Sequence, residues 1–210
     1  MRRPLAISTT INYAPLASLC AVEVASGGSA VYPVAPVKIL ILSCSLNPRS
    51  KSHALALRAA ELFEAAGAET CVVELGALEL PICGSPGCFD HPQAAQLTAR
   101  VREADGVLLA SPIYNYDVNA ACKNAIELTG EGWEEKVVGF LLTAGGQSSY
   151  MSVMSLANSL MLDFRCVIVP RFVYATGAAF RDGVLADPEI ARRVEQLCAE
   201  LLRMAAALRG

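Results

Sequence analysis

Apolar runs alternate with amphipathic stretches along residues 37–210 of this 210-residue chain. A short, continuous apolar run is typical of a strand buried on both faces, and apolar residues repeated at helical spacing predict a helix. These patterns predict strands over residues 37–43, 69–75, 105–111, 136–143 and 166–176, the last of them interrupted. They predict helices over residues 51–66, 92–104, 119–129, 150–162 and 190–208.

Because a helix separates most strands from the next, the pattern predicts the α/β class with a parallel sheet and right-handed crossovers. Two strand orders are common for such a sheet, Rossmann and flavodoxin-like, and five strands with short crossovers favour the second. We therefore predict a flavodoxin-like three-layer sandwich, with a five-stranded parallel sheet of order 2-1-3-4-5 and helices on both faces. A single domain over residues 37–210 would contain it.

The composition narrows the classes of partner. Apolar residues make up 54% of the chain, charged residues 18%, and the formal net charge is −3, so nothing favours nucleic-acid binding. The sequence contains no run of about 18 apolar residues, so no membrane span is predicted. The eight cysteines lie mostly inside apolar runs, which indicates buried free thiols in a reducing compartment. Cys83 and Cys88 share a Gly/Pro loop but lack the spacing of a zinc or thioredoxin site, so no metal site is predicted.

Residues 1–36 differ in composition from the rest of the chain. They are rich in Ser, Thr, Ala and Pro, they include Arg2 and Arg3, and no acidic residue comes before Glu23. Such a segment is typical of a targeting peptide, and a disordered extension or a start codon assigned too early would give the same composition. We expect a cytoplasmic protein, and import into an organelle is the alternative that this N-terminal extension leaves open.

Three polar loops follow the first, third and fourth predicted strands. In a 2-1-3-4-5 sheet these strands are adjacent, so their loops line one crevice at the carboxyl edge, where open α/β sheets bind ligands. The first loop offers the hydroxyls of Ser45, Ser50 and Ser52 and the guanidinium of Arg49 ahead of a helix N-terminus, a combination that suits phosphate. A polar loop with an ordinary N-cap has the same composition. The chain has neither GxxxxGK[ST] nor GxGxxG, which argues against a P-loop NTPase and against a tightly held dinucleotide.

The second and third loops suit a flat ring. Pro112 stiffens the second loop, while Tyr114 and Asn115 offer an apolar surface and an amide. Gly145 and Gly146 in the third loop let backbone N–H groups approach a ligand edge and stabilise negative charge there. Taken singly, the tyrosine is also compatible with core packing and the glycines with a simple turn. Together, a phosphate cradle, a flat loop and a donor loop in this order describe a site for flavin mononucleotide (FMN).

These motifs resemble those of the NADPH-dependent FMN reductase family, and the resemblance covers residues 37–210. The matching residues are the first loop, 45–52; Pro112, Tyr114 and Asn115 with Lys123, Asn124, Ala125 and Ile126; Gly145 and Gly146; and Phe180, Asp182, Gly183, Leu185, Asp187, Pro188 and Glu189. Asn47 stands where the family has an arginine, and Arg49 follows two positions later. Cys122 and Glu127 replace a leucine and an aspartate of the second motif.

The resemblance implies FMN as the cofactor and NADPH or NADH as the electron donor. A hydride would pass from the nicotinamide to N5 of the flavin, and electrons would then pass to a small acceptor such as free flavin or a quinone, without a catalytic side chain. Because members of the family pair through helices near the flavin, a homodimer or homotetramer is expected. The loops and the resemblance together assign cofactor binding to Ser43, Ser45, Asn47, Arg49, Ser50, Ser52, Pro112, Ile113, Tyr114, Asn115, Thr143, Ala144, Gly145, Gly146 and Gln147.

Two other functions are alternatives. An electron carrier of the flavodoxin type would bind FMN without oxidising NAD(P)H directly. Carriers of this fold are strongly acidic, so a net charge of −3 weighs against this class. A hydrolase using Ser148 or Ser149 with His53 or His91 is disfavoured, because the chain has no GxSxG elbow and neither histidine follows the serine.

Overall fold

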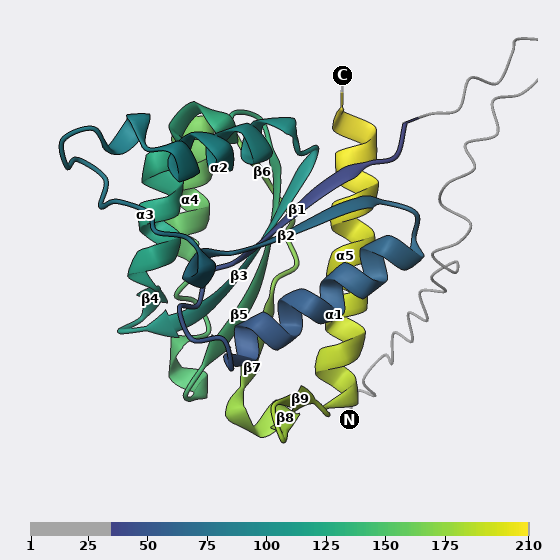
Figure 1. Cartoon of the computed structure of the whole chain (residues 1–210). Coiled ribbons are helices and arrows are strands. Elements are labelled where there is room, and N and C mark those ends of the chain that lie inside the picture. Colours follow the sequence, from purple (N-terminus) through teal and green to yellow (C-terminus); the bar gives the residue numbers. More distant parts are fainter. Residues whose placement is uncertain (1–34, 210) are drawn as a thin grey trace, which may run out of the picture.

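The computed structural model describes residues 35–209 of the chain. They form a mostly parallel sheet with helices on both faces (Figure 1). Its strands are β1 (Lys38–Ser43), β2 (Glu69–Glu74), β3 (Gly106–Tyr114), β4 (Asp117–Val118), β5 (Val137–Ala144), β6 (Val167–Ile168) and β7 (Val173–Thr176). The helices are α1 (Lys51–Ala65), α2 (Pro92–Glu103), α3 (Ala120–Thr129), α4 (Met154–Phe164) and α5 (Pro188–Leu208). Short 3-10 turns are η2 (Leu75–Ala77), η3 (Cys88–Asp90), η4 (Gly130–Trp133), η5 (Gln147–Ser149) and η6 (Gly177–Ala179), and β8 (Phe180–Arg181) and β9 (Val184–Leu185) form a separate hairpin.

The strand order is β2-β1-β3-β5, followed by β6 and β7, which both pair in parallel with β5. The predicted order 2-1-3-4-5 is therefore confirmed, and its fifth position consists of two short strands. Pro170 lies between them, and a proline cannot donate a ladder hydrogen bond, which explains the interruption. The sheet nevertheless has seven strands where the sequence predicted five, because the fifth is split and β4 adds an antiparallel pair to β3.

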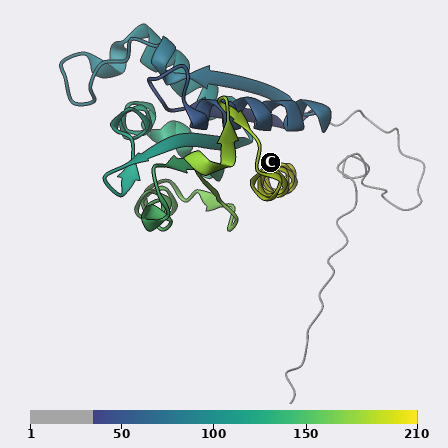
Figure 2. The same ribbon diagram turned by 90° about the horizontal axis from the view of Figure 1, so that it is seen from below.

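The core lies in two layers, one on each face of the sheet. Successive side chains of a strand point to opposite faces, so Ile39 and Ile41 pack against α1 and α5, whereas Leu40 and Leu42 pack against the layer of α2, α3 and α4. Figure 2 shows this arrangement from below, with α3 and α4 on one side of the strands and α1 and α5 on the other. The continuous apolar run of β1 thus reflects burial on both faces.

The last helix, α5, buries most of an apolar stripe on one of its faces. Its N-cap residue is Asp187, whose carboxylate accepts hydrogen bonds from the N–H groups of Glu189 and Ile190 at 2.8 and 3.2 Å. Val194, Leu197 and Leu201 are fully buried against the sheet. The stripe therefore contributes to the core of its own chain.

Two element boundaries differ from the predicted ones by three or more residues. Strand β3 continues to Tyr114 where the sequence predicted an end at residue 111, because Ile113 and Tyr114 pair with β4. Helix α4 begins at Met154 where the prediction began it at residue 150. Residues 147–153 form η5 and a turn instead, and the ring of Tyr150 packs against the ring of Phe172, with centroids 5.2 Å apart.

Three further predictions concern the N-terminal extension, membrane spans and the cysteines. The predicted extension over residues 1–36 lies outside the described residues, apart from Ala35 and Pro36. Within residues 35–209, no helix combines the length and the apolar character that crossing a bilayer requires. The seven cysteines of this range are free thiols, and five of them are buried, as the apolar runs around them predicted.

Close packing between β5 and α5 leads to the first prediction. A Cβ atom on Gly139 would lie 2.8 Å from Cδ1 of Leu201, 3.1 Å from Cδ1 of Leu108 and 3.2 Å from Cδ1 of Leu197. Because these leucines are fully buried, Gly139→Ala should lower the free energy of unfolding by about 1–3 kcal/mol in denaturant titrations. Gly177→Ala is the control, since its Cβ would meet nothing closer than 3.8 Å and should cost no stability. Equal midpoints for the two variants would contradict tight packing at Gly139.

Candidate active site

The three predicted loops lie at one edge of the sheet because β1, β3 and β5 are neighbours that run in the same direction (Figure 1). Cys44, which begins the first loop, donates its backbone N–H to the Ala110 carbonyl of β3 at 2.8 Å. Pro112 and Thr143 are register partners in β3 and β5. The pairing of the strands thus carries the loops to a common edge, as the sequence predicted.

A cavity of about 450 Å³ opens at this edge between the first loop and the second. Its volume lies within the range of small-molecule and cofactor sites. Its lining residues are Ser45, Leu46, Asn47, Tyr114, Asn119, Ala120 and Ala121. The structure therefore brings together three predicted residues, Ser45, Asn47 and Tyr114, while the third loop does not line this cavity.

The first loop is shaped by hydrogen bonds among its own residues. The Asn47 N–H donates to Ser45 Oγ at 3.2 Å, and the Arg49 N–H donates to Asn47 Oδ1 at 3.0 Å. Ser50 is the N-cap of α1, and its Oγ accepts the His53 N–H at 3.0 Å. The capping role that the sequence left as an alternative is therefore real for Ser50.

The same helix start keeps donors available for an anion. The backbone N–H groups of Lys51 and Ser52 have no acceptor among the described residues, as expected in the first turn of a helix. The Arg49 side chain is exposed beside them. These groups form a positively polarised end of α1 that suits a phosphate.

Two predicted serines lie below the loop surface. Ser43 is 1% exposed, and its Oγ lies 3.0 Å from Nδ1 of His53. Ser52 is fully buried, and its Oγ lies 3.2 Å from Oγ of Ser50. Both hydroxyls have partners within the chain, so the structure places these side chains under the cradle, whereas Asn47 and Arg49 lie at its surface.

Cys44, at the start of the first loop, is also buried. A hydrogen bond with the Cys122 thiol of α3 and burial together raise the pKa of Cys44 well above its usual value. A thiol with a raised pKa carries little thiolate, which is the nucleophilic form. The Cys44 thiol is part of the apolar core beneath the first loop.

The second loop is the tip of a hairpin between β3 and β4. Tyr114 pairs with Asp117, and the two residues between them, Asn115 and Tyr116, have φ values of 51° and 66°. Two consecutive left-handed residues form the turn that suits a two-residue hairpin. Pro112 and Ile113 are buried in β3, whereas Tyr114 and Tyr116 are 60% and 55% exposed at the tip.

The third loop follows β5, where Thr143 is buried and Gly145, Gly146 and Gln147 are exposed. Gly146 has φ −157°, an extended conformation open to any residue, and a Cβ atom there would meet nothing within 4 Å. Neither backbone strain nor packing within the described chain therefore requires glycine at this position. The open space in front of Gly146 is what a ligand that approaches the backbone needs.

Tyr174 of β7 contacts the backbone of the third loop. Its hydroxyl donates to the Gly146 carbonyl at 2.5 Å, and its buried ring lies 5.6 Å from the ring of Tyr150. The sequence prediction missed Tyr174 because the contact joins residues 28 positions apart. It also missed Tyr116 and Asn119, although Asn119 had one local signal, an asparagine at a predicted helix start.

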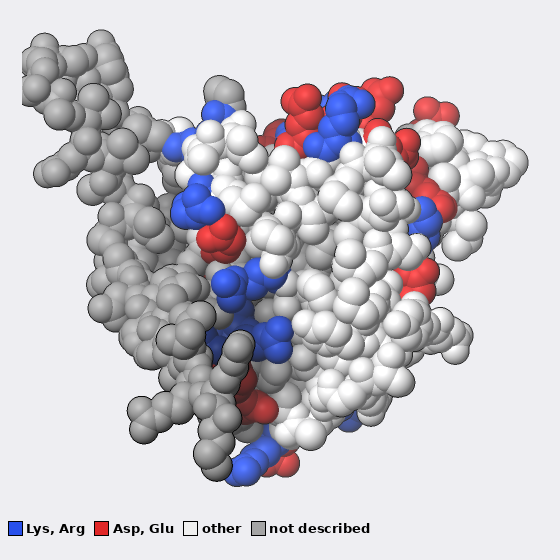
Figure 3. Space-filling view, turned by 180° about the vertical axis from the view of Figure 1, so that it is seen from behind, with Lys and Arg blue, Asp and Glu red and all other residues white. Residues whose placement is uncertain are grey.

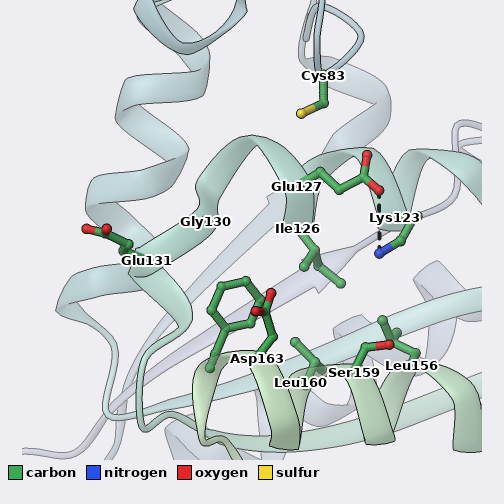
Figure 4. A pocket seen from close by; sticks show the side chains of 11 residues that line it. Cys83, Lys123, Ile126, Glu127, Gly130, Glu131, Leu156, Ser159, Leu160 and Asp163 are labelled. Carbon is green, nitrogen blue, oxygen red and sulfur yellow. Dashed lines mark ion pairs between the residues drawn. The ribbon is translucent and has the colours of Figure 1, made fainter.

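A second cavity, of about 410 Å³, lies between α3 and α4, and no residue of the three loops lines it (Figure 4). Ile126, Leu156 and Leu160 line it, and a 3.4 Å ion pair joins Lys123 and Glu127 at its rim. The Lys-Asn-Ala-Ile motif of the sequence thus contributes to the wall between α3 and α4 and does not line the cavity beside the first loop.

Comparison with known proteins decides the family. The sequence model of the NADPH-dependent FMN reductase family matches residues 37–180, which include all three loops. The chain belongs to this family. The predicted family is confirmed.

Two proteins of similar sequence are a bacterial flavin reductase and a plant quinone oxidoreductase. The chain is 30% identical over 106 residues to the NAD(P)H-dependent FAD/FMN reductase of Geobacillus thermodenitrificans (strain NG80-2), a match covering 50% of this chain and 57% of that protein. It is 25% identical over 185 residues to the probable NADPH:quinone oxidoreductase 2 of Oryza sativa subsp. japonica, covering 83% of this chain and 91% of that protein. The chain thus spans little more than half the length of the first relative.

Solved structures confirm the predicted fold. The flavoenzyme NAD(P)H:(acceptor) oxidoreductase FerB of Paracoccus denitrificans superposes with a TM-score of 0.68 and 21% identity, over 81% of this chain and 98% of that chain. At this identity the likeness establishes the flavodoxin-like fold alone.

The contact between Tyr174 and Gly146 gives a prediction for the third loop. Tyr174→Phe keeps the buried ring and removes the hydrogen bond, so we expect the free energy of unfolding to fall by about 0.5–1.5 kcal/mol in denaturant titrations. Tyr150→Phe is the matched control, because the hydroxyl of this 40% exposed tyrosine bonds to no described residue. Equal stabilities of the two variants would show that Tyr174 does not hold the loop.

Proposed function

We propose that this member of the FMN reductase family is an FMN-dependent NAD(P)H oxidoreductase that passes electrons to a small acceptor such as a quinone or free flavin. The observation that carries the proposal is the cavity between the first loop and the β3–β4 hairpin, at the carboxyl edge of the sheet. Open α/β sheets bind their ligands at this edge, where the strand order reverses. The family match covers every element that forms the cavity.

The donors and surfaces at this edge of the sheet support the assignment of FMN, from its phosphate to its ring. At one end, the free N–H groups of Lys51 and Ser52 and the exposed Arg49 suit the phosphate. At the hairpin, the exposed ring of Tyr114 and the backbone of Asn115 suit the flat ring system. At the third loop, the open space in front of Gly146 suits the pyrimidine edge of that ring.

FMN, when bound, supplies the two-electron chemistry. The chain's own part is to orient it. The start of α1 would fix the phosphate, the hairpin would support one side of the ring, and backbone N–H groups of the third loop would stabilise negative charge at the pyrimidine edge. No side chain of the described residues is assigned a proton-transfer role.

The test of this proposal is binding of FMN followed by anaerobic reduction. We expect the purified chain to bind FMN and the bound flavin to bleach on addition of NADPH or NADH, with reoxidation by an added quinone. Gly146→Val should fold normally, because its backbone is extended and its Cβ has space, yet weaken FMN binding by about tenfold or more, since it fills the ring's space.

Two results would contradict the proposal. Failure of the wild-type chain to bind FMN would remove the cofactor assignment altogether. Bound FMN that neither nicotinamide reduces would identify an electron carrier, the alternative that the sequence left open. An unchanged unfolding midpoint for Gly146→Val separates loss of the site from loss of the fold.

We further propose that the chain pairs with a second copy of itself through α4. The sequence has no Asp, Glu, Lys or Arg between Lys136 and Asp163, and Met154, Met161 and Leu162 of α4 are 46%, 41% and 76% exposed. Seen from behind, a broad area of the surface lacks charged side chains (Figure 3). A two-fold contact sets residues near the axis against their own copies, so an uncharged face avoids repulsion of like charges.

A single charge on this face should separate the copies. We expect a homodimer or homotetramer for the wild-type chain by light scattering after gel filtration. For Leu162→Glu we expect a monomer in the first case and a dimer in the second, because a carboxylate would be desolvated at the contact. Val184→Glu is the control, since Val184 is 68% exposed on β9, outside the α4 face. A monomeric wild type, or a Leu162→Glu variant of the same assembly size as the wild type, would contradict this interface.

We also propose that the protein works in the cytoplasm. Seven free cysteines in residues 35–209 support a reducing compartment, where thiols are not oxidised to disulfides. Burial is the main cause that raises the pKa of Cys166 to about 11, so this thiol stays protonated at neutral pH.

A further inference from the structure

Asn119 lies at the point where the first loop, the β3–β4 hairpin and α3 meet. It is the N-cap residue of α3, it is 6% exposed, and it lines the cavity beside the first loop. An asparagine at this position commonly accepts a hydrogen bond from the second or third N–H group of its own helix. The Asn119 side chain makes no such bond. Its buried amide is therefore used for another purpose.

The amide joins the starts of two loops. Its Nδ2 donates to the Cys44 carbonyl at 2.7 Å, directly before Ser45 of the first loop. Its Oδ1 lies 3.1 Å from the hydroxyl of Ser111, which also lies 3.0 Å from the Pro112 carbonyl at the base of the hairpin. The backbone N–H of Asn119 donates back to Ser111 Oγ at 3.4 Å.

These bonds form a buried bridge that spans 75 positions of sequence. Ser111 is fully buried and Asn119 is 6% exposed, so the groups of this bridge are largely removed from solvent. Buried polar groups without partners are costly, so the two loops keep their relative position as long as the bridge is intact. A shift of the first loop would have to move the hairpin base with it or break the bridge.

We propose that Asn119 is a positioning residue that couples the phosphate end of the FMN site to its ring end. This inference rests on the proposed function, in which the first loop receives the phosphate and the hairpin supports the ring. Phosphate held at the start of α1 orders the first loop, the Asn119 amide carries that order to the hairpin base, and the ring then binds to a hairpin already in place. Coupling of this kind is reciprocal, since each ligand changes the affinity of the other by the same factor.

The test uses one molecule for each end of FMN. Riboflavin carries the ring without the phosphate, and inorganic phosphate represents the other end. For the wild-type chain we expect saturating phosphate to tighten riboflavin binding about fivefold or more, measured by quenching of riboflavin fluorescence. For Asn119→Ala we expect riboflavin binding that phosphate does not change.

Two further variants keep the test decisive if Asn119→Ala does not fold. Asn119→Asp keeps the acceptor for Ser111 but replaces the donor to the Cys44 carbonyl by an oxygen, so the bridge breaks on one side only. Ser111→Ala removes the other side at a fully buried position that does not line the cavity. Both variants should lose the effect of phosphate on riboflavin binding.

Asn124→Ala is the matched control. The Asn124 side chain makes a similar pair of bonds, accepting the Cys83 N–H at 2.8 Å and donating to the Pro81 carbonyl at 2.9 Å, but these hold the segment before η3 against α3. This variant should keep the wild-type response to phosphate. Thermal unfolding of each variant shows whether it is folded under the binding conditions.

The outcomes separate this inference from the proposed function. A wild-type chain that binds FMN but whose riboflavin affinity ignores phosphate would overturn the coupling and leave the FMN site standing. Persistence of the phosphate effect in the folded Asn119 and Ser111 variants would overturn the role of the bridge. A wild-type chain that binds neither FMN nor riboflavin would overturn the proposed function itself.

Discussion

Three parallel strands, β1, β3 and β5, are hydrogen-bonded side by side, and this pairing determines where every loop of the candidate site lies. Their side chains are buried almost throughout and close-packed on both faces, so a shift by one residue would exchange the side chains of the two layers and disrupt that packing. The register that aligns Ser43 with Ala110 and Pro112 with Thr143 is therefore strongly specified. Loops that leave such a sheet start from fixed points, and the chemistry of the site depends on that rigidity.

The sequence was most informative where the physical signal is local. Continuous apolar runs identified the buried strands, and the break at Pro170 explains why the fifth one is interrupted. The stripe of α5 and the N-cap serine of α1 also depend on neighbours within a few positions. The motif of the second loop predicts a ligand-binding loop, but its hairpin shape was not predicted, because the pairing of Tyr114 with Asp117 competes with a plain loop leading into a helix.

Contacts between distant parts of the chain could not be predicted from the sequence. The sequence shows that Asn119 can cap a helix, but only the fold places the Cys44 carbonyl 2.7 Å from its amide. The same holds for Tyr174, whose hydroxyl meets the Gly146 carbonyl only after β7 has paired with β5. Burial of Ser43 and Ser52 follows from the packing of α1 on the sheet, which their hydroxyl character alone does not predict.

The division of the fifth strand into β6 and β7 affects how easily the edge of the sheet can pair with a strand of another molecule. A long, straight outer strand offers a row of unpaired N–H and C=O groups on which a strand of another molecule can add. Here that border consists of β6, with two residues, and β7, with four, separated by a segment that contains Pro170. Neither piece is long enough to template a foreign strand, and the opposite border, β2, begins and ends with exposed glutamates, Glu69 and Glu74. The two borders therefore resist amyloid-like growth.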